Sequence, residues 1–300
     1  MNFKISVVSF IFLFACINCS EDGIIGTGIT RVRIDGAAQK GPFILDSDVT
    51  INLLRENGEP TSIVIPTRTT DNLGSFNFTT TNLGLAQINV QGFHFNELTG
   101  TLSGAPIVLR GIYEITENEA QKAFVNILTH LINLRIITLI SSGSTASAAI
   151  SQGQLELILQ LKDVLLLTAV PIMQLSAFTQ MSVYNSEDTS PEGNAYLLAL
   201  SATVYQYATS VAEQTNSSLD AELSLTINTL AQDLANDGQI NSQSLITGLI
   251  DASRALIPDD IVFNLQQRSL EVIQSQLEVP DINLFIDSDG DGIVNINDMD

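Results

Sequence analysis

Hydrophobic and polar residues alternate with a period of two between about residues 31 and 109. Five segments carry the pattern: "SDVTINLL", "TSIVIPT", "GSFNFTTT", "LAQINVQGFHF" and "APIVLRGIYEI". Glycine, asparagine and aspartate lie between them, as in "ENG" and "DNLG". Short alternating segments separated by turn residues are typical of strands with one buried face. We therefore predict an antiparallel β-sandwich over residues 31–112.

The spacing of apolar residues becomes helical after residue 116. Thr116 and Glu119 fit a capping box, and the apolar pattern behind them continues to Gly143. Further helices are predicted at 151–180, 191–213, 218–236, 242–256 and 259–277. Several are apolar on more than one face, which is typical of helices inside a bundle. The fold class predicted is α+β with two segregated domains, the β-sandwich followed by an all-α helical bundle at 116–279.

The first residues combine one positive charge with a short apolar run. Lys4 precedes a run from Ile5 to Ala15, which is shorter than the ~20 residues that span a bilayer. A charged start with a short apolar core is typical of a signal peptide, which we place at residues 1–15. The Gly-rich stretch up to residue 30 is predicted to be a tether.

The end of the apolar run, "LFAC", resembles a bacterial lipobox. The resemblance implies a lipoprotein lipidated at Cys16, with Cys19 as the alternative acceptor. An ordinary secretory peptide is the other interpretation. Neither cysteine is followed by aspartate, which by resemblance to Gram-negative lipoproteins favours the outer membrane or cell surface. Because these are the only two cysteines, the rest of the chain offers no thiolate nucleophile and no structural disulfide.

Charge excludes one class of partner. The chain has 12 Lys and Arg against 33 Asp and Glu, for a formal net charge of -21. Nucleic acids and anionic membrane surfaces attract basic faces, so we expect no nucleic-acid partner and membrane association only through a lipid anchor. A chain with this negative net charge attracts cations.

The last residues, "DSDGDGIVNINDMD", follow the spacing of a calcium loop. Calcium prefers six to eight oxygen ligands, and an acidic loop of about 12 residues can supply them. The spacing assigns side-chain oxygens, and one backbone carbonyl at Ile293, to a Ca²⁺ site within residues 280–300. The candidate ligands are Asp287, Asp289, Asp291, Ile293, Asn295 and Asp298.

Gly292 would permit the reversal of the backbone, and Val294 would pack against the body. Asp298 stands where an EF-hand has glutamate, so the loop resembles those of dockerins and thrombospondin type 3 repeats. A solvated acidic tail is the competing interpretation. Dockerins use two such loops, and one is visible here.

Several longer stretches resemble a group of bacterial surface lipoproteins of unassigned activity. They are "DGAAQKGPFILDSDVTI", "TTDNLGSFNF", "GFHFNELTGTLSGAPIVL" and "NILTHLINLRI". The resemblance implies that the N-terminal domain is a carboxypeptidase regulatory-like (transthyretin-type) β-sandwich. It implies no substrate, because the shared stretches are packing and turn motifs.

Other candidate sites are expected to be structural. We expect His94 to make a hydrogen bond at a strand edge and His130 to pack between helices. The stretch "DLANDGQINSQS" at 233–244 imitates the calcium spacing but lacks two carboxylates, so Gly238 is predicted to end a helix. No nucleophile elbow, zinc motif or phosphate-binding loop is present in the sequence.

Together these patterns predict a non-catalytic, lipid-anchored protein of the bacterial cell envelope that binds calcium at its C-terminal loop. Its role would be adhesive or structural, with a protein or polysaccharide partner. The alternative is an extracellular hydrolase, or an accessory of polysaccharide degradation that docks as dockerins do.

Overall fold

The computed structural model describes residues 31–117 and 120–299. The predicted signal peptide at 1–15, the tether at 16–30 and both cysteines lie outside these residues. Their assignments therefore stay predictions. Within the described ranges, no helix is both long and apolar enough to cross a membrane.

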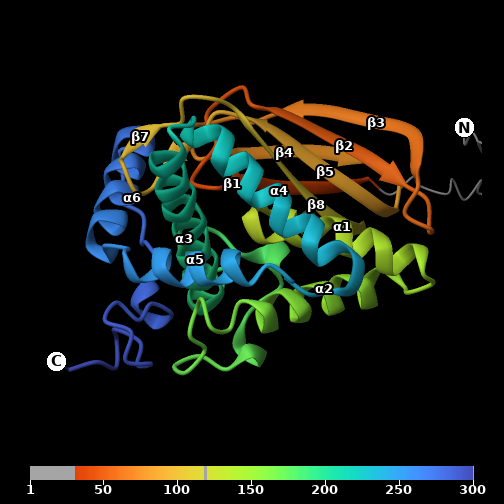
Figure 1. Cartoon of the computed structure of the whole chain (residues 1–300). Helices are drawn as coiled ribbons and strands as arrows, with labels where there is room; N and C mark the ends of the chain where they lie inside the picture. The colour runs from red at the N-terminus through yellow and green to blue at the C-terminus, as the bar shows by residue number, and fades with distance from the viewer. Residues whose placement is uncertain (1–30, 118–119, 300) are drawn as a thin grey trace, which may run out of the picture.

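The strands form two four-stranded sheets and a small hairpin (Figure 1). In the first sheet, β1 (Val32–Gln39) pairs antiparallel with β4 (Ser75–Thr80). The short strands β9 (Ala120–Lys122) and β10 (Val125–Asn126) run parallel to β1.

The second sheet is antiparallel throughout and has the order β3-β2-β5-β8. Its strands are β3 (Pro60–Arg68), β2 (Asp48–Leu54), β5 (Gly84–Gly92) and β8 (Ile107–Ile115). The hairpin pairs β6 (Phe95–Asn96) with β7 (Thr101–Leu102). Every second residue of β2 is buried, so the alternation in the sequence marks the face that packs inward.

Six α-helices follow the strands in the described chain. They are α1 (Ile127–Ser141), α2 (Ala146–Gln160), α3 (Pro191–Thr215), α4 (Leu219–Asp237), α5 (Gln243–Arg254) and α6 (Pro258–Ile273). The helices predicted at 191–213, 218–236, 242–256 and 259–277 are confirmed to within a few residues. Ser190 caps α3 through its hydroxyl, and Pro191 occupies the first turn, where its missing N–H costs nothing.

Two predicted helix limits are wrong. The segment after Thr116 forms β9 and β10, and the first helix begins only at Ile127. The helix predicted at 151–180 ends at Gln160, and two single 3₁₀ turns, Ile172–Gln174 and Phe178–Gln180, occupy the stretch around Pro171. Local capping and apolar patterns failed here because pairing with β1 and the proline decide the backbone path.

The α+β class is confirmed, but the arrangement as two segregated domains is not. One continuous cluster of buried apolar side chains extends from Val32 in β1 through the helices to Ile286. Strands β9 and β10, which lie on the helical side of the predicted boundary, belong to the sheet of β1. Helix α1 packs against the second sheet, where Gln87 of β5 donates a hydrogen bond to Asn133 of α1 at 3.0 Å.

The join between sheet and helix depends on Asn126. Its side chain accepts the backbone N–H of Thr129 at 3.0 Å, and the Thr129 hydroxyl accepts the N–H of Asn126 in return. The Asn126 amide also donates to the carbonyls of Phe178 and Met181, at 2.8 and 3.2 Å. The residue is fully buried, so no water can replace these bonds.

Replacement Asn126→Ala is expected to lower the free energy of unfolding by about 2–4 kcal/mol, because a cap is lost and two buried carbonyls lose a donor. Urea denaturation followed by circular dichroism measures the change. Thr145→Ala, which removes the exposed cap of α2, is the matched control and should cost only about 1 kcal/mol. Equal losses in the two variants would contradict the buried role of Asn126.

Candidate metal centre at the C-terminal loop

The C-terminal segment is fixed to the body by apolar side chains. Ile282, Phe285, Ile286 and Val294 are fully buried although they lie near the end of the chain. The Phe285 ring packs edge-to-face on Tyr196 of α3, with 5.4 Å between ring centroids. The backbone carbonyl of Phe285 accepts the N–H of Leu166. In Figure 1 this segment lies beside α5 and α6, at the opposite end from β3.

Between these anchors, the acidic residues fold the chain into a tight loop. The two carboxylate oxygens of Asp287 accept the backbone N–H groups of Gly290 and Gly292, at 2.7 and 3.0 Å. Asp289 accepts the N–H of Asp291 at 3.1 Å, and Asp291 accepts that of Ile293 at 2.7 Å. Each carboxylate is thereby oriented by the backbone of the loop itself.

Two glycines allow this path. Gly290 and Gly292 have φ angles of 83° and 91°, which L side chains rarely adopt. At Gly290 space is also restricted, because an added Cβ would lie 2.8 Å from Cζ of Arg254. The Arg254 guanidinium, at the end of α5, thus places a positive charge against the loop and offsets part of the repulsion between its carboxylates.

Three of the predicted ligands converge. One carboxylate oxygen each from Asp287, Asp289 and Asp291 lie within 4.8 Å of one another. Oxygens that share one calcium ion at about 2.3–2.6 Å cannot be more than about 5 Å apart, so this spacing fits a single ion. Asp287 is nearly buried, while Asp289 and Asp291 are exposed. These residues could hold a metal ion, and hard oxygen donors favour a cation of the calcium or magnesium type.

The other predicted ligands are placed differently. Asp298 is not part of this convergent group. The side chain of Asn295 accepts the N–H of Ser288 at 3.0 Å and donates to Asn283 at 3.1 Å, so it braces the loop. Ile293 has an exposed side chain, as a residue that contributes only its carbonyl would. Val294 packs into the body as the sequence predicts.

The segment at 233–244, whose sequence imitates the spacing of the calcium loop, ends a helix as the sequence predicts. Gly238 ends α4 with a φ of 79°. A carboxylate oxygen of Asp233 accepts the backbone N–H groups of Asn241 and Ser242, at 2.8 and 3.2 Å, which closes the turn into α5.

Both histidines are buried and neutral. Burial is the main cause that lowers the pKa of His94 to about 3. Burial also lowers the pKa of His130 to about 4, with Arg110 acting in the same direction and a hydrogen bond with Asn228 of α4 opposing it. His130 therefore packs between α1 and α4, as expected. The backbone of His94 exchanges hydrogen bonds with Ser103, and the two ring nitrogens have no partner within the described residues.

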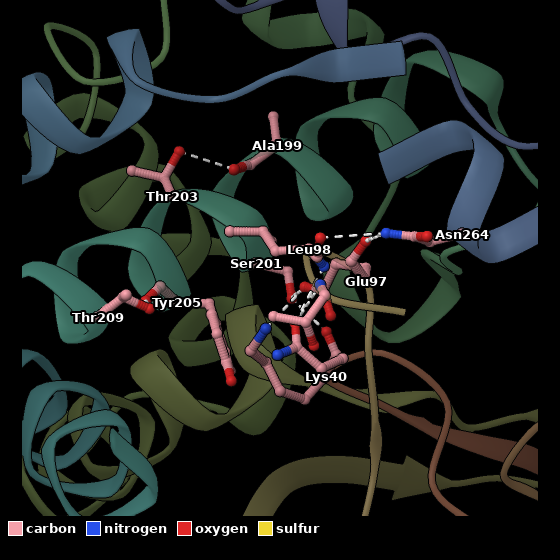
Figure 2. Close-up of polar contacts among 11 residues, drawn as sticks. Lys40, Glu97, Leu98, Ala199, Ser201, Thr203, Tyr205, Thr209 and Asn264 are labelled. Carbon is pink, nitrogen blue, oxygen red and sulfur yellow. Dashed lines mark hydrogen bonds and ion pairs between the residues drawn. The ribbon is translucent and has the colours of Figure 1, made fainter. Parts of the chain in front are cut away.

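Sequence patterns missed a buried polar cluster formed by Lys40, Glu97 and Ser201 (Figure 2). Nζ of Lys40 lies 2.6 Å from Oε1 of Glu97, and the two side chains are 1% and 0% exposed. Ser201 of α3 contacts both the Lys40 carbonyl and Oε1 of Glu97. A lysine within the small and apolar run "AAQKGPF" was the available signal, but its partner is 57 residues away.

Comparison with protein families, with characterised proteins and with solved structures found no match. The resemblance to carboxypeptidase regulatory-like surface lipoproteins stays a prediction.

Truncation of the main anchor is expected to free the loop. Phe285→Ala should lower the free energy of unfolding by about 3–5 kcal/mol, because a large buried ring is removed from a packed site. Limited proteolysis should then cut the chain within residues 280–299 faster than in the parent protein. Ile296→Ala, at an exposed position of the same segment, is the control and should change stability by less than about 0.5 kcal/mol. Unchanged cleavage in Phe285→Ala would contradict the anchoring role.

Proposed function

We propose that this chain is a non-catalytic, lipid-anchored protein of the bacterial cell envelope whose C-terminal loop binds calcium. The convergence of Asp287, Asp289 and Asp291 in a loop fixed to the body carries the proposal. The sequence spacing adds Asn295 and Asp298 as ligands that would complete the coordination on binding. The role proposed for the protein is adhesive or structural, toward a protein or polysaccharide partner.

The loop residues would act by ordering. Three carboxylates at this separation repel one another, and a bound divalent cation supplies the charge that neutralises them. Two backbone N–H groups of the loop donate hydrogen bonds to Asp287, so the carboxylate is already oriented before an ion binds. Asp289 and Asp291 are exposed and can close on an ion from the solvent side. Val294 and Phe285 would transmit that order to the body through their packing.

The non-catalytic part of the proposal is supported by the burial of both histidines and of the cluster of Lys40, Glu97 and Ser201. His94, His130, Lys40, Glu97 and Ser201 are at most 3% exposed, so a substrate has no approach to them. The formal net charge of the chain, -21, suits a protein in a calcium-containing extracellular medium.

The anchor and the β part belong to the same proposal. The "LFAC" stretch supports lipidation at Cys16, with Cys19 as the alternative, and hence placement in the outer membrane or at the cell surface. Residues 31–112 are proposed to belong to a carboxypeptidase regulatory-like sandwich, which shares its apolar interior with the helices.

Calcium titration of the purified protein by isothermal calorimetry is expected to show one binding event. The triple variant Asp287, Asp289 and Asp291→Asn should abolish it, because each amide keeps one oxygen acceptor but carries no charge. The change Asp287→Asn would also remove one of the two loop hydrogen bonds that Asp287 accepts. The matched control is the pair Asp233 and Asp237→Asn at the C-terminal end of α4, which should leave the event unchanged. Calcium binding that persists in the triple variant, or that is lost in the control, would contradict the assignment of the site to these three aspartates.

Labelling of cells with an alkyne analogue of palmitate tests the anchor. The parent chain should incorporate the label, Cys16→Ser should lose it, and Cys19→Ser should keep it. Labelling lost only in Cys19→Ser would move the acceptor to the alternative site, and an unlabelled parent chain would remove the anchor.

A further inference from the structure

The cluster of Lys40, Glu97 and Ser201 joins three distant segments of the chain. Lys40 directly follows β1, Glu97 directly follows β6, and Ser201 lies in the middle of α3. Figure 2 shows the Lys40 and Glu97 side chains pointing toward each other beside the Tyr205 ring, and Nζ of Lys40 lies 4.7 Å from the centre of that ring. Gly41 permits this approach, since a Cβ there would meet the Phe95 carbonyl at 2.1 Å and Oε2 of Glu97 at 3.0 Å.

An ion pair is poorly accommodated at this position. An ammonium has three N–H donors and a carboxylate about four lone-pair sites. In the described part of the chain, Oε1 of Glu97 is the hydrogen-bond acceptor of Lys40 Nζ, and Oε2 of Glu97 has no partner. Among the described residues, the Ser201 hydroxyl also contacts the pair, 2.8 Å from Oε1. Two buried charges with so few partners bear a large desolvation cost.

Burial favours the uncharged amine of Lys40. Desolvation lowers the pKa of Lys40 despite the attraction of Glu97, whose Oε1 lies 2.6 Å from Nζ. An uncharged amine keeps the nitrogen lone pair that a nucleophile needs. The Ser201 hydroxyl carries one proton and contacts two acceptors, the Lys40 carbonyl and Oε1 of Glu97, so it can donate to either one.

We propose that Lys40 and Glu97 condense into an intramolecular amide, which cross-links the end of β1 to the β6–β7 hairpin. Nζ of Lys40 attacks Cδ of Glu97, the Nζ–Cδ bond forms and one Cδ–O bond breaks. Of the three ammonium protons, one stays on the amide nitrogen and two leave with the carboxyl oxygen as one water molecule. Charge and atoms balance without an oxidant or a further reactant.

The surroundings match the needs of an amide. The amide carbonyl oxygen needs one donor, which the Ser201 hydroxyl provides from α3. The same hydroxyl is placed to stabilise the oxygen of the tetrahedral intermediate. Water is excluded, because all three side chains are buried, and this favours condensation over the reverse hydrolysis. The described chain has no cysteine, so such a bond would be its means of covalent cross-linking.

Trypsin digestion of the denatured full-length chain, followed by mass spectrometry, tests the cross-link. Trypsin does not cut after an acylated lysine, so peptide 34–55 should stay whole and be joined to peptide 69–110. The joined species should weigh one water less than the sum of the two peptides, and fragmentation should place the bond between Lys40 and Glu97. Separate peptides 34–40, 41–55 and 69–110, with no joined species, would overturn the proposal.

Two lysine variants sharpen the test. Lys40→Arg keeps the positive charge but should yield no joined species. Lys122→Arg changes a second lysine that contacts a carboxylate, Asp188, at 2.7 Å but lies at the surface, and it should keep the joined species at the parent level. The digest of the parent chain decides the question even if Lys40→Arg does not fold. A joined species that persists in Lys40→Arg, or a bond at another residue, would contradict the assignment.

Discussion

The apolar interior that the sheets share with the helices is the constraint on which the rest of the structure depends. Apolar side chains of α1 pack against β8 of the second sheet, and α1 in turn packs against α2 and α4. Because sheet and helices bury one continuous interior, neither part hides its apolar face alone. The same interior extends to the C-terminal segment, where Phe285 packs on Tyr196 of α3. The position of the acidic loop is therefore set by the whole fold.

Repulsion and burial oppose each other in that loop. Asp287, Asp289 and Asp291 would separate if the segment were free, because like charges at this distance disfavour a compact turn. Buried Ile282, Phe285 and Val294 hold both sides of the loop, and the loop's own N–H groups orient its carboxylates. A cation would thus meet ligands that are largely preorganised. Its binding would require the exposed side chains to close on the ion, but it would not require the segment to fold.

The sequence predicted the features whose signals are local. Alternation located β2 to β5 and β8, proline and glycine located the limits of α3 and α4, and spacing located Asp287, Asp289 and Asp291. It did not predict contacts between distant segments. Strands β9 and β10 are too short to show a period, and their pairing with β1 overrides the capping pattern at Thr116. Asp298 fits the spacing, yet it lies outside the convergent group, since spacing along a chain does not fix where a side chain points. The contact between Lys40 and Glu97 likewise depends on tertiary packing alone.

Hydrogen–deuterium exchange of the backbone amides, with and without calcium, measures whether the C-terminal loop binds the ion. The N–H groups of Gly290, Gly292 and Ile293 already bond to the carboxylates that would hold the ion. A ligand at a hundredfold excess over its dissociation constant slows exchange through unbound states by about 100-fold. We predict slowing of this order confined to residues 286–298, with the strands unchanged. Exchange that calcium leaves unaltered in this loop, or slows only elsewhere, would contradict it.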